Sequence, residues 1–360
     1  MQVGINQPWW LYHTFGIDFG GLPRSDQRHW THGVDAVFDS YASIGLRIVR
    51  WFIFGSGAML LPSPRREAAG TVTAAPPIGL GRQVLDDFEL LHRKARSHGL
   101  RLVPTFLDFH FAFAPEFGDR VKGGRSSWIS DTAKRHALFE NVLEPLLGVS
   151  ASYPDTIYAW DLFNEPEWCT DVLVPPSRTV RQANVRLSDM KAFLREGCAR
   201  ITQHRLPATV GFNDPMTPSQ WALAGPPITR TQVHHYGRIT GSLITAAASE
   251  AVDGEPAPAN SYGPSAFLGE FPFNVTGNYR WLRPGDRRPS SGPNSYEESL
   301  YERLQNLQPL GYDAVLGWSY PLQDHPPGPT DPEGSWPEVR ADLEAFLVGS
   351  RGARTAIGRA

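Results

Sequence analysis

The chain has 360 residues, a formal net charge of −3 at pH 7 and an apolar content of 41%. This length suits one large α/β barrel, and the apolar content is sufficient for a large core. No block of like charge occurs, which argues against nucleic acid or an anionic membrane surface as a partner. No segment is apolar over the length that crosses a bilayer. We therefore expect a monomer that binds neither nucleic acid nor membranes.

The beginning of the chain and its two cysteines bear on the cellular compartment. Met1 is followed almost at once by a strand candidate, with no charged and apolar leader before it. As written, the sequence predicts a cytoplasmic protein, or a secreted one if an upstream signal peptide is missing. Cys169 and Cys198 have neither the number of a disulfide framework nor the spacing of metal ligands. We expect incidental thiols, and no cofactor.

Short apolar runs alternate with helical stretches along almost the whole chain. The eight strand candidates are Val3–Asn6, Leu46–Phe54, Leu100–His110, Ile157–Glu165, Ala208–Asn213, Thr231–Tyr236, Ala266–Phe271 and Ala314–Tyr320. The helix candidates are Val34–Ile44, Val84–Ser97, Thr132–Leu147, Ser188–His204, Tyr296–Leu307 and a last helix that ends near Leu347.

This alternation predicts a single (β/α)₈ barrel over residues 1–348, followed by a flexible tail at 349–360. The competing architecture is a doubly wound open sheet. Such a sheet would need a glycine-rich phosphate turn after its first strand, and Val3–Trp10 has none. The barrel is therefore favoured, with long loops at the carboxyl ends of its strands.

The fourth strand candidate ends in Asn164-Glu165-Pro166. Pro166 has no N–H for the sheet ladder and stops the strand, which places Glu165 at the carboxyl end. The seventh candidate has the same form, because Glu270 leaves an apolar strand just before Pro272. Two carboxylates facing each other across a barrel mouth, about 5–5.5 Å apart, suit retaining glycoside hydrolysis.

An ordered set of residues at the strand ends resembles glycoside hydrolases of clan A, and specifically family five, which contains cellulases and mannanases. The resemblance covers the chain from Arg50 to Trp318. It implies that Glu165 is the acid/base and Glu270 the nucleophile of a double displacement through a covalent glycosyl-enzyme. The substrate-binding positions that it implies are Arg50, His110, Asn164, His234, Tyr236 and Trp318.

Each implied role has a physical reason. Arg50 and Tyr236 can hold Glu270 ionised and aimed through charge-assisted hydrogen bonds. The negative charge of Glu270 is expected to raise the pKa of Glu165, so that it can protonate the leaving oxygen. Asn164 is placed to form a hydrogen bond with the 2-hydroxyl of the sugar, and this bond becomes stronger as the transition state is approached.

The other implied positions concern the sugar ring. Trp318 would stack under the ring, and His110 and His234 would bond sugar hydroxyls or Glu165. Strand alternation points His235 the other way, toward a structural role. Roles for Asp108 and Asp161 stay open, either as supporting residues or as polar groups satisfied within the core.

Two other functions compete with this one. A metal-dependent barrel hydrolase could use His110, His234 and a carboxylate, but it would want a His-x-His pair on the first strand, and Val3–Asn6 has no histidine. A carbohydrate-binding pseudoenzyme would have lost one of the two glutamates, and both are present.

The expected substrate is a β-linked glucan, mannan or related oligosaccharide. A short, soluble substrate is favoured by the missing leader and by long loops after the first and seventh strands, which can close a cleft into a pocket.

Overall fold

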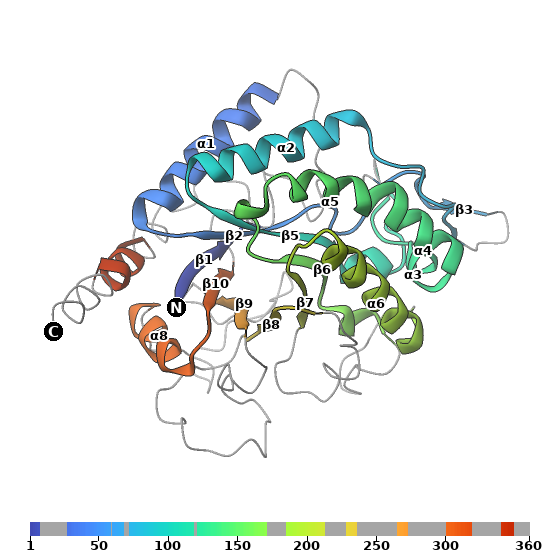
Figure 1. Ribbon diagram of the computed structural model, residues 1–360. Helices are drawn as coiled ribbons and strands as arrows, with labels where there is room; N and C mark the ends of the chain where they lie inside the picture. Colours follow the sequence, from blue (N-terminus) through green and yellow to red (C-terminus); the bar gives the residue numbers. More distant parts are fainter. Residues whose placement is uncertain are drawn as a thin grey trace, which may run out of the picture.

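The computed structural model describes ten stretches of the chain (Figure 1): residues 1–7, 27–58, 60–67, 72–118, 121–170, 185–212, 228–235, 265–272, 300–318 and 340–348. Tyr236, the long loops after the first and seventh strands and the tail at 349–360 lie outside these residues.

Eight parallel strands form a closed barrel in the order β1-β10-β9-β8-β7-β6-β5-β2. Their bounds are β1 Gln2–Asn6, β2 Ile48–Phe52, β5 Arg101–Asp108, β6 Trp160–Asn164, β7 Ala208–Phe212, β8 Thr231–His234, β9 Ala266–Pro272 and β10 Ala314–Trp318. A small antiparallel pair, β3 Arg65–Arg66 and β4 Val72–Thr73, lies outside the barrel. The (β/α)₈ architecture predicted from the sequence is confirmed.

The described helices lie on the outside of the barrel, between β1 and β2, β2 and β5, β5 and β6, β6 and β7, and β9 and β10, with one more after β10. The α-helices are α1 Gln27–Ile44, α2 Arg82–Ser97, α3 Ser126–Ser130, α4 Thr132–Leu138, α5 Glu144–Ala151, α6 Leu187–Gln203, α8 Leu300–Leu307 and a helix over residues 340–348. The short 3₁₀ turns are η1 Phe109–Ala112, η3 Pro154–Thr156, η4 Pro166–Cys169 and η6 Gln308–Leu310, and η2 Phe139–Leu143 is a π-helical turn.

In Figure 1, α1, α2 and α5 lie side by side over the strands β2 and β5. The helix α6 packs against β6 and β7. Among the described helices, none is long and apolar enough to cross a lipid bilayer.

The inside of the barrel is layered. A small apolar cluster fills the lower part; its members are Ile48, Val103, Tyr158, Ala159, Phe267, Ala314 and Leu316. Fully buried polar side chains lie nearer the carboxyl ends of the strands, among them Arg50, Asp161 and Gln232. A barrel interior is a packed core, so chemistry can be placed only at this upper, polar end.

The fourth barrel strand is shorter than predicted, because it begins at Trp160 and not at Ile157. The turn η3 precedes it, and Ile157 makes only an isolated bridge to Leu102. Pro154 has no N–H to offer a ladder, and it starts this turn instead of a strand. The strand ends at Asn164, one residue before the predicted end at Glu165.

Candidate active site

Both strands that carry the predicted catalytic glutamates have an irregular register. On β6 the pairing with β7 shifts between Asp161 and Asn164. Strict alternation would put these two residues, three apart, on opposite faces of the sheet. Instead Leu162 and Phe163 both pack outward on α6, and the polar side chains on either side of them both point into the barrel. A β-bulge re-aims side chains in this way.

The strand β9 uses the same device. Its pairing with β8 shifts between the partners of Val233 and His234. Phe267 belongs to the apolar cluster inside the barrel, yet Glu270, three residues further on, also points inward to contact Arg50. The irregular register therefore brings a carboxylate to the upper end of the barrel.

A left-handed backbone turn completes the end of β6. Glu165 has φ 49° and ψ 57°. This conformation costs roughly 1–2 kcal/mol for a residue other than glycine, and such strain gathers at functional sites. It allows the consecutive residues Asn164 and Glu165 to face the same site, where one contacts Arg50 and the other His234.

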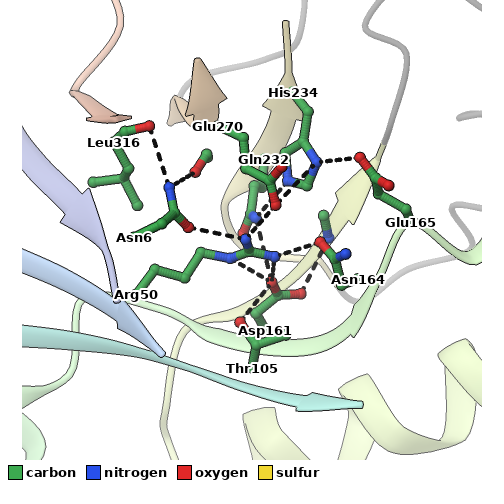
Figure 2. Close-up of polar contacts among 12 residues, drawn as sticks. Asn6, Arg50, Thr105, Asp161, Asn164, Glu165, Gln232, His234, Glu270 and Leu316 are labelled. Atoms are coloured by element: carbon green, nitrogen blue, oxygen red, sulfur yellow. Dashed lines mark hydrogen bonds and ion pairs between the residues drawn. The ribbon is translucent and has the colours of Figure 1, made fainter. Parts of the chain in front are cut away.

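The guanidinium of Arg50 lies at the centre of the site (Figure 2) and is completely buried. It makes five hydrogen bonds: Nε and Nη2 to Asp161 at 3.0 and 2.7 Å, Nη1 to Glu270 at 2.6 Å and to Asn6 at 3.1 Å, and Nη2 to Asn164 at 2.7 Å. All of its donors are thereby used. The planar fork fixes the directions of both Asn164 and Glu270.

Asp161 is the principal counter-charge of Arg50. Its carboxylate is fully buried and also accepts hydrogen bonds from Thr105 Oγ1, the backbone N–H of Gly211 and Gln232 Nε2, at 3.1, 3.1 and 3.3 Å. Desolvation works against the charge of Arg50, but the negative charges of Asp161 and Glu270 outweigh it and raise the Arg50 pKa. Glu270 therefore faces a permanent cation.

The two predicted catalytic glutamates both lie close to the same histidine, His234. His234 Nδ1 lies 2.9 Å from Glu165 Oε1 and 3.5 Å from Glu270 Oε1. One oxygen of each glutamate and a ring nitrogen of His234 all lie within 4.8 Å of one another. Glu165 is 8% exposed and Glu270 2%. The two carboxylates are therefore close together and almost completely buried from solvent, so their protonation states depend on the neighbouring side chains.

The surroundings make the two carboxylates different. Burial, and after it the negative charge of Asp108, raises the pKa of Glu165 to about 8. Burial, not a neighbouring charge, is thus the leading cause, and the contribution expected from the charge of Glu270 stays a prediction. Burial lowers the pKa of His234 to about 4, and its ring is neutral near pH 7. A protonated Glu165 thus faces a Glu270 that is bonded to Arg50.

The remaining predicted residues lie around this centre. His110, on η1, bonds through Nδ1 to Asp108, which also accepts from Asn164 Nδ2 at 2.8 Å. Trp318 ends β10 and is 4% exposed, with its ring edge-to-face on Phe52 at 6.0 Å. Tyr236 lies outside the described residues. The stacking and hydroxyl-binding roles of His110 and Trp318 stay predictions.

Three supporting residues were not selected from the sequence. Asn6 donates to the carbonyls of Gly269, Leu316 and Gly317 and accepts from Arg50, so it ties β1 to the site. Asp161 was left undecided, and Gln232 was not considered. A usable signal existed for Asp161, which stands between the apolar residues Trp160 and Leu162 of its strand, because a polar side chain in such a place needs a buried partner.

Replacing Arg50 with Met is expected to lower the free energy of unfolding by about 3–5 kcal/mol, because Asp161 and Glu270 would be left buried without a cation. Chemical denaturation at pH 7 measures this. The matched control is Arg96→Met: Arg96 is 45% exposed and pairs with Asp155 at the surface, so little or no loss of stability is expected there. Equal losses in the two variants would contradict the central role of Arg50.

Comparison with known proteins assigns the fold. No protein-family model and no curated protein matches the sequence. Solved structures match it over almost its full length, and this likeness shows that the chain shares their fold.

Three of these structures are a β-mannanase from the blue mussel Mytilus edulis, a glycoside hydrolase family 5 enzyme from Prevotella bryantii B14 and an exo-β-1,4-mannosidase from Opitutaceae bacterium strain TAV5. Their TM-scores are 0.64, 0.54 and 0.55, at 16%, 14% and 16% identity. The matches cover 95%, 96% and 95% of this chain, and 90%, 95% and 55% of the other chains.

Proposed function

We propose that the protein is a retaining glycoside hydrolase that cleaves β-linked oligosaccharides or glycans. The observation that carries this proposal is the pair of carboxylates at the ends of β6 and β9. Glu165 and Glu270 present oxygens within 4.8 Å of each other, and their environments favour opposite protonation states. A pair of this kind supplies one acid and one nucleophile.

The first half of the reaction forms a glycosyl ester. Glu270, aimed by Arg50 Nη1, attacks the anomeric carbon, and the bond to the leaving oxygen breaks. Glu165 gives its proton to that oxygen, so that the leaving group departs as a neutral alcohol. Asn164, fixed by Arg50 and Asp108, offers its amide to the 2-hydroxyl of the sugar.

The second half releases the sugar. Once Glu270 is esterified, its charge is gone and Glu165 is ionised. Glu165 then takes a proton from a water molecule, whose oxygen attacks the anomeric carbon and displaces Glu270 as a carboxylate. Two inversions at the same carbon give net retention of configuration.

The substrate class is the next part of the proposal. Mannanases and a mannosidase occur among the similar structures, which supports β-1,4-linked manno-oligosaccharides as the first substrates to test, with gluco-oligosaccharides beside them. We expect soluble di- to hexasaccharides to be hydrolysed faster than a swollen polysaccharide of the same linkage. A fast fall in the viscosity of the polymer, with few new reducing ends, would mean mid-chain attack and contradict this expectation.

The described residues also bring one possible metal-binding group together, formed by Glu165, His234 and Glu270. His110, the other histidine that the metal-dependent reading needs, is not part of this group, and its Nδ1 bonds Asp108. A cation bound there would be repelled by the guanidinium of Arg50, which lies 2.6 Å from Glu270 Oε1. This repulsion favours the metal-free reaction.

Dialysis against a strong chelator is therefore expected to leave the hydrolytic rate unchanged, because proton transfer and nucleophilic attack use side chains alone. The rate is measured on the same oligosaccharide before and after dialysis, with a metal-free buffer as the control. Loss of activity that added zinc restores would favour the metal-dependent alternative.

A further inference from the structure

Gln232 lies close to the two glutamates, and its hydrogen bonds go to neither of them. It is fully buried on β8, and its Nε2 is 3.3 Å from Asp161 Oδ2 and 3.1 Å from His234 Nε2 (Figure 2). Its Oε1 has no hydrogen-bond partner among the residues that the structure describes. A buried acceptor without a partner costs roughly 1–3 kcal/mol, so the orientation of this amide calls for a reason.

The orientation of the amide is set by its neighbours. The carboxylate of Asp161 can only accept a hydrogen bond, and it therefore requires the NH₂ side of the amide. Gly211 and Gly269 both lie very close to this amide: a Cβ atom added to them would be only 2.8 and 2.5 Å from Gln232 Nε2. The side chain therefore has little room to move away. The second N–H of the same NH₂ group is left for His234 Nε2.

We propose that Gln232 is a positioning residue: it donates to His234 Nε2 and so fixes the single proton of the neutral ring on Nδ1, facing Glu165 and Glu270. A nitrogen that accepts an N–H cannot carry a proton itself, which leaves Nδ1 as the donor. The low pKa of His234, about 4, agrees with a ring that carries one proton at neutral pH.

The consequence for catalysis rests on the proposed function. His234 Nδ1–H donates to Glu165 Oε1 at 2.9 Å, so the acid proton of Glu165 sits on the other oxygen, Oε2. There it is free to pass to the leaving group. In the opposite tautomer Nδ1 would be an acceptor, and it would draw the Glu165 proton toward the ring. Gln232 thus governs which oxygen holds the acid proton, by way of His234.

The tautomer can be measured without any activity. In ¹⁵N-histidine-labelled protein, long-range ¹H–¹⁵N spectra distinguish protonated from unprotonated ring nitrogens, and the His234 signals are those missing from the His234→Asn variant. We expect wild-type His234 with a protonated Nδ1 and an unprotonated Nε2. A proton on Nε2 overturns the proposal, whatever the enzyme hydrolyses.

The variant Gln232→Met removes the donor at nearly constant length. We expect its His234 signals to shift toward the Nε2-protonated form. We also expect kcat to fall at least about 10-fold on a natural oligosaccharide, and much less on a glycoside with an activated leaving group, which needs no proton. KM should stay nearly unchanged, because Gln232 is buried beneath the sugar site.

The matched control is Thr209→Val, on the neighbouring strand β7. The hydroxyl of Thr209 is buried and has no partner among the described residues. This variant should keep both the tautomer and the rate. An unchanged tautomer in Gln232→Met, or equal losses on the two kinds of substrate, overturns the role of Gln232. If Gln232→Met does not fold, the wild-type spectrum alone decides. If the proposed hydrolysis fails altogether, the spectra still test the tautomer.

Discussion

Replacing Glu270 with Gln is expected to abolish hydrolysis, with a loss of at least about 10⁴-fold in kcat/KM. An amide cannot form and release the glycosyl ester, so no other group takes over the attack on the anomeric carbon. The Gln side chain still offers an oxygen to Arg50 Nη1, now 2.6 Å from Glu270 Oε1, and the fold should be retained. Initial rates on an activated aryl glycoside and on a natural oligosaccharide measure the loss, which should affect both.

The control for this variant is Glu144→Gln. Glu144 pairs with Arg200 and His204 on the outside of the barrel, far from the chemistry. Its activity should stay within about 2-fold of wild type, since surface pairs contribute little. Residual activity of Glu270→Gln above about a hundredth of wild type, in protein free of wild-type contamination, would mean that Glu270 is not the nucleophile.

Replacing Glu165 with Ala is expected to separate substrates by their leaving groups. Natural oligosaccharides should lose about 10²–10⁴-fold in kcat/KM, the usual contribution of a general acid. A glycoside with an activated leaving group needs no proton and should lose far less in the first step. Its second step then lacks a base for water, so the glycosyl-enzyme should accumulate, and azide should speed its release. Equal losses on both substrates would contradict the acid/base role of Glu165.

The pH dependence follows from the raised pKa of Glu165. The acid form is needed for the first step, and it is present below its pKa of about 8. Wild-type kcat/KM on a natural substrate should therefore fall as the pH rises through about 8. In Glu165→Ala, acting on an activated substrate, this alkaline decline should be absent. A decline at the same pH in the variant would assign it to another group.

The barrel could be predicted from the sequence because its strands are short apolar runs bounded by turns, and helical stretches follow six of the eight. The glutamates could be placed because a proline follows each of them closely in the sequence. Pro166 lies just beyond the end of β6, whereas β9 runs on through Pro272, which pairs with Trp318, so Pro272 does not stop the strand as expected. The start of β6 could not be predicted, because Ile157 is as apolar and as typical of a strand as the residues of β6 themselves. Only the turn at Pro154–Thr156, just before Ile157, accompanies the later start at Trp160.

The hydrogen-bond network around Arg50 was harder to predict, because the regular in–out alternation of strand side chains fails at the residues that form it. Asp161 and Asn164 are three residues apart and would be assigned to opposite faces, yet an irregular register turns both inward. Burial raises the pKa of Glu165 most, and the next cause is one that the strand pattern does not reveal: the charge of Asp108, which lies on β5 and joins the site only in the folded barrel. Contacts of this kind depend on register, and register is set by the whole barrel.

Trapping the glycosyl-enzyme tests the central claim most directly. A 2-deoxy-2-fluoro glycoside with an activated leaving group slows both steps, and the good leaving group lets the first outrun the second. Peptide mass spectrometry of the inactivated protein then finds the labelled residue. We expect one sugar per chain, bound through an ester to Glu270 in the peptide of β9. A label on Glu165 or another carboxylate, or turnover with inverted configuration and no label, would contradict retaining hydrolysis by this pair.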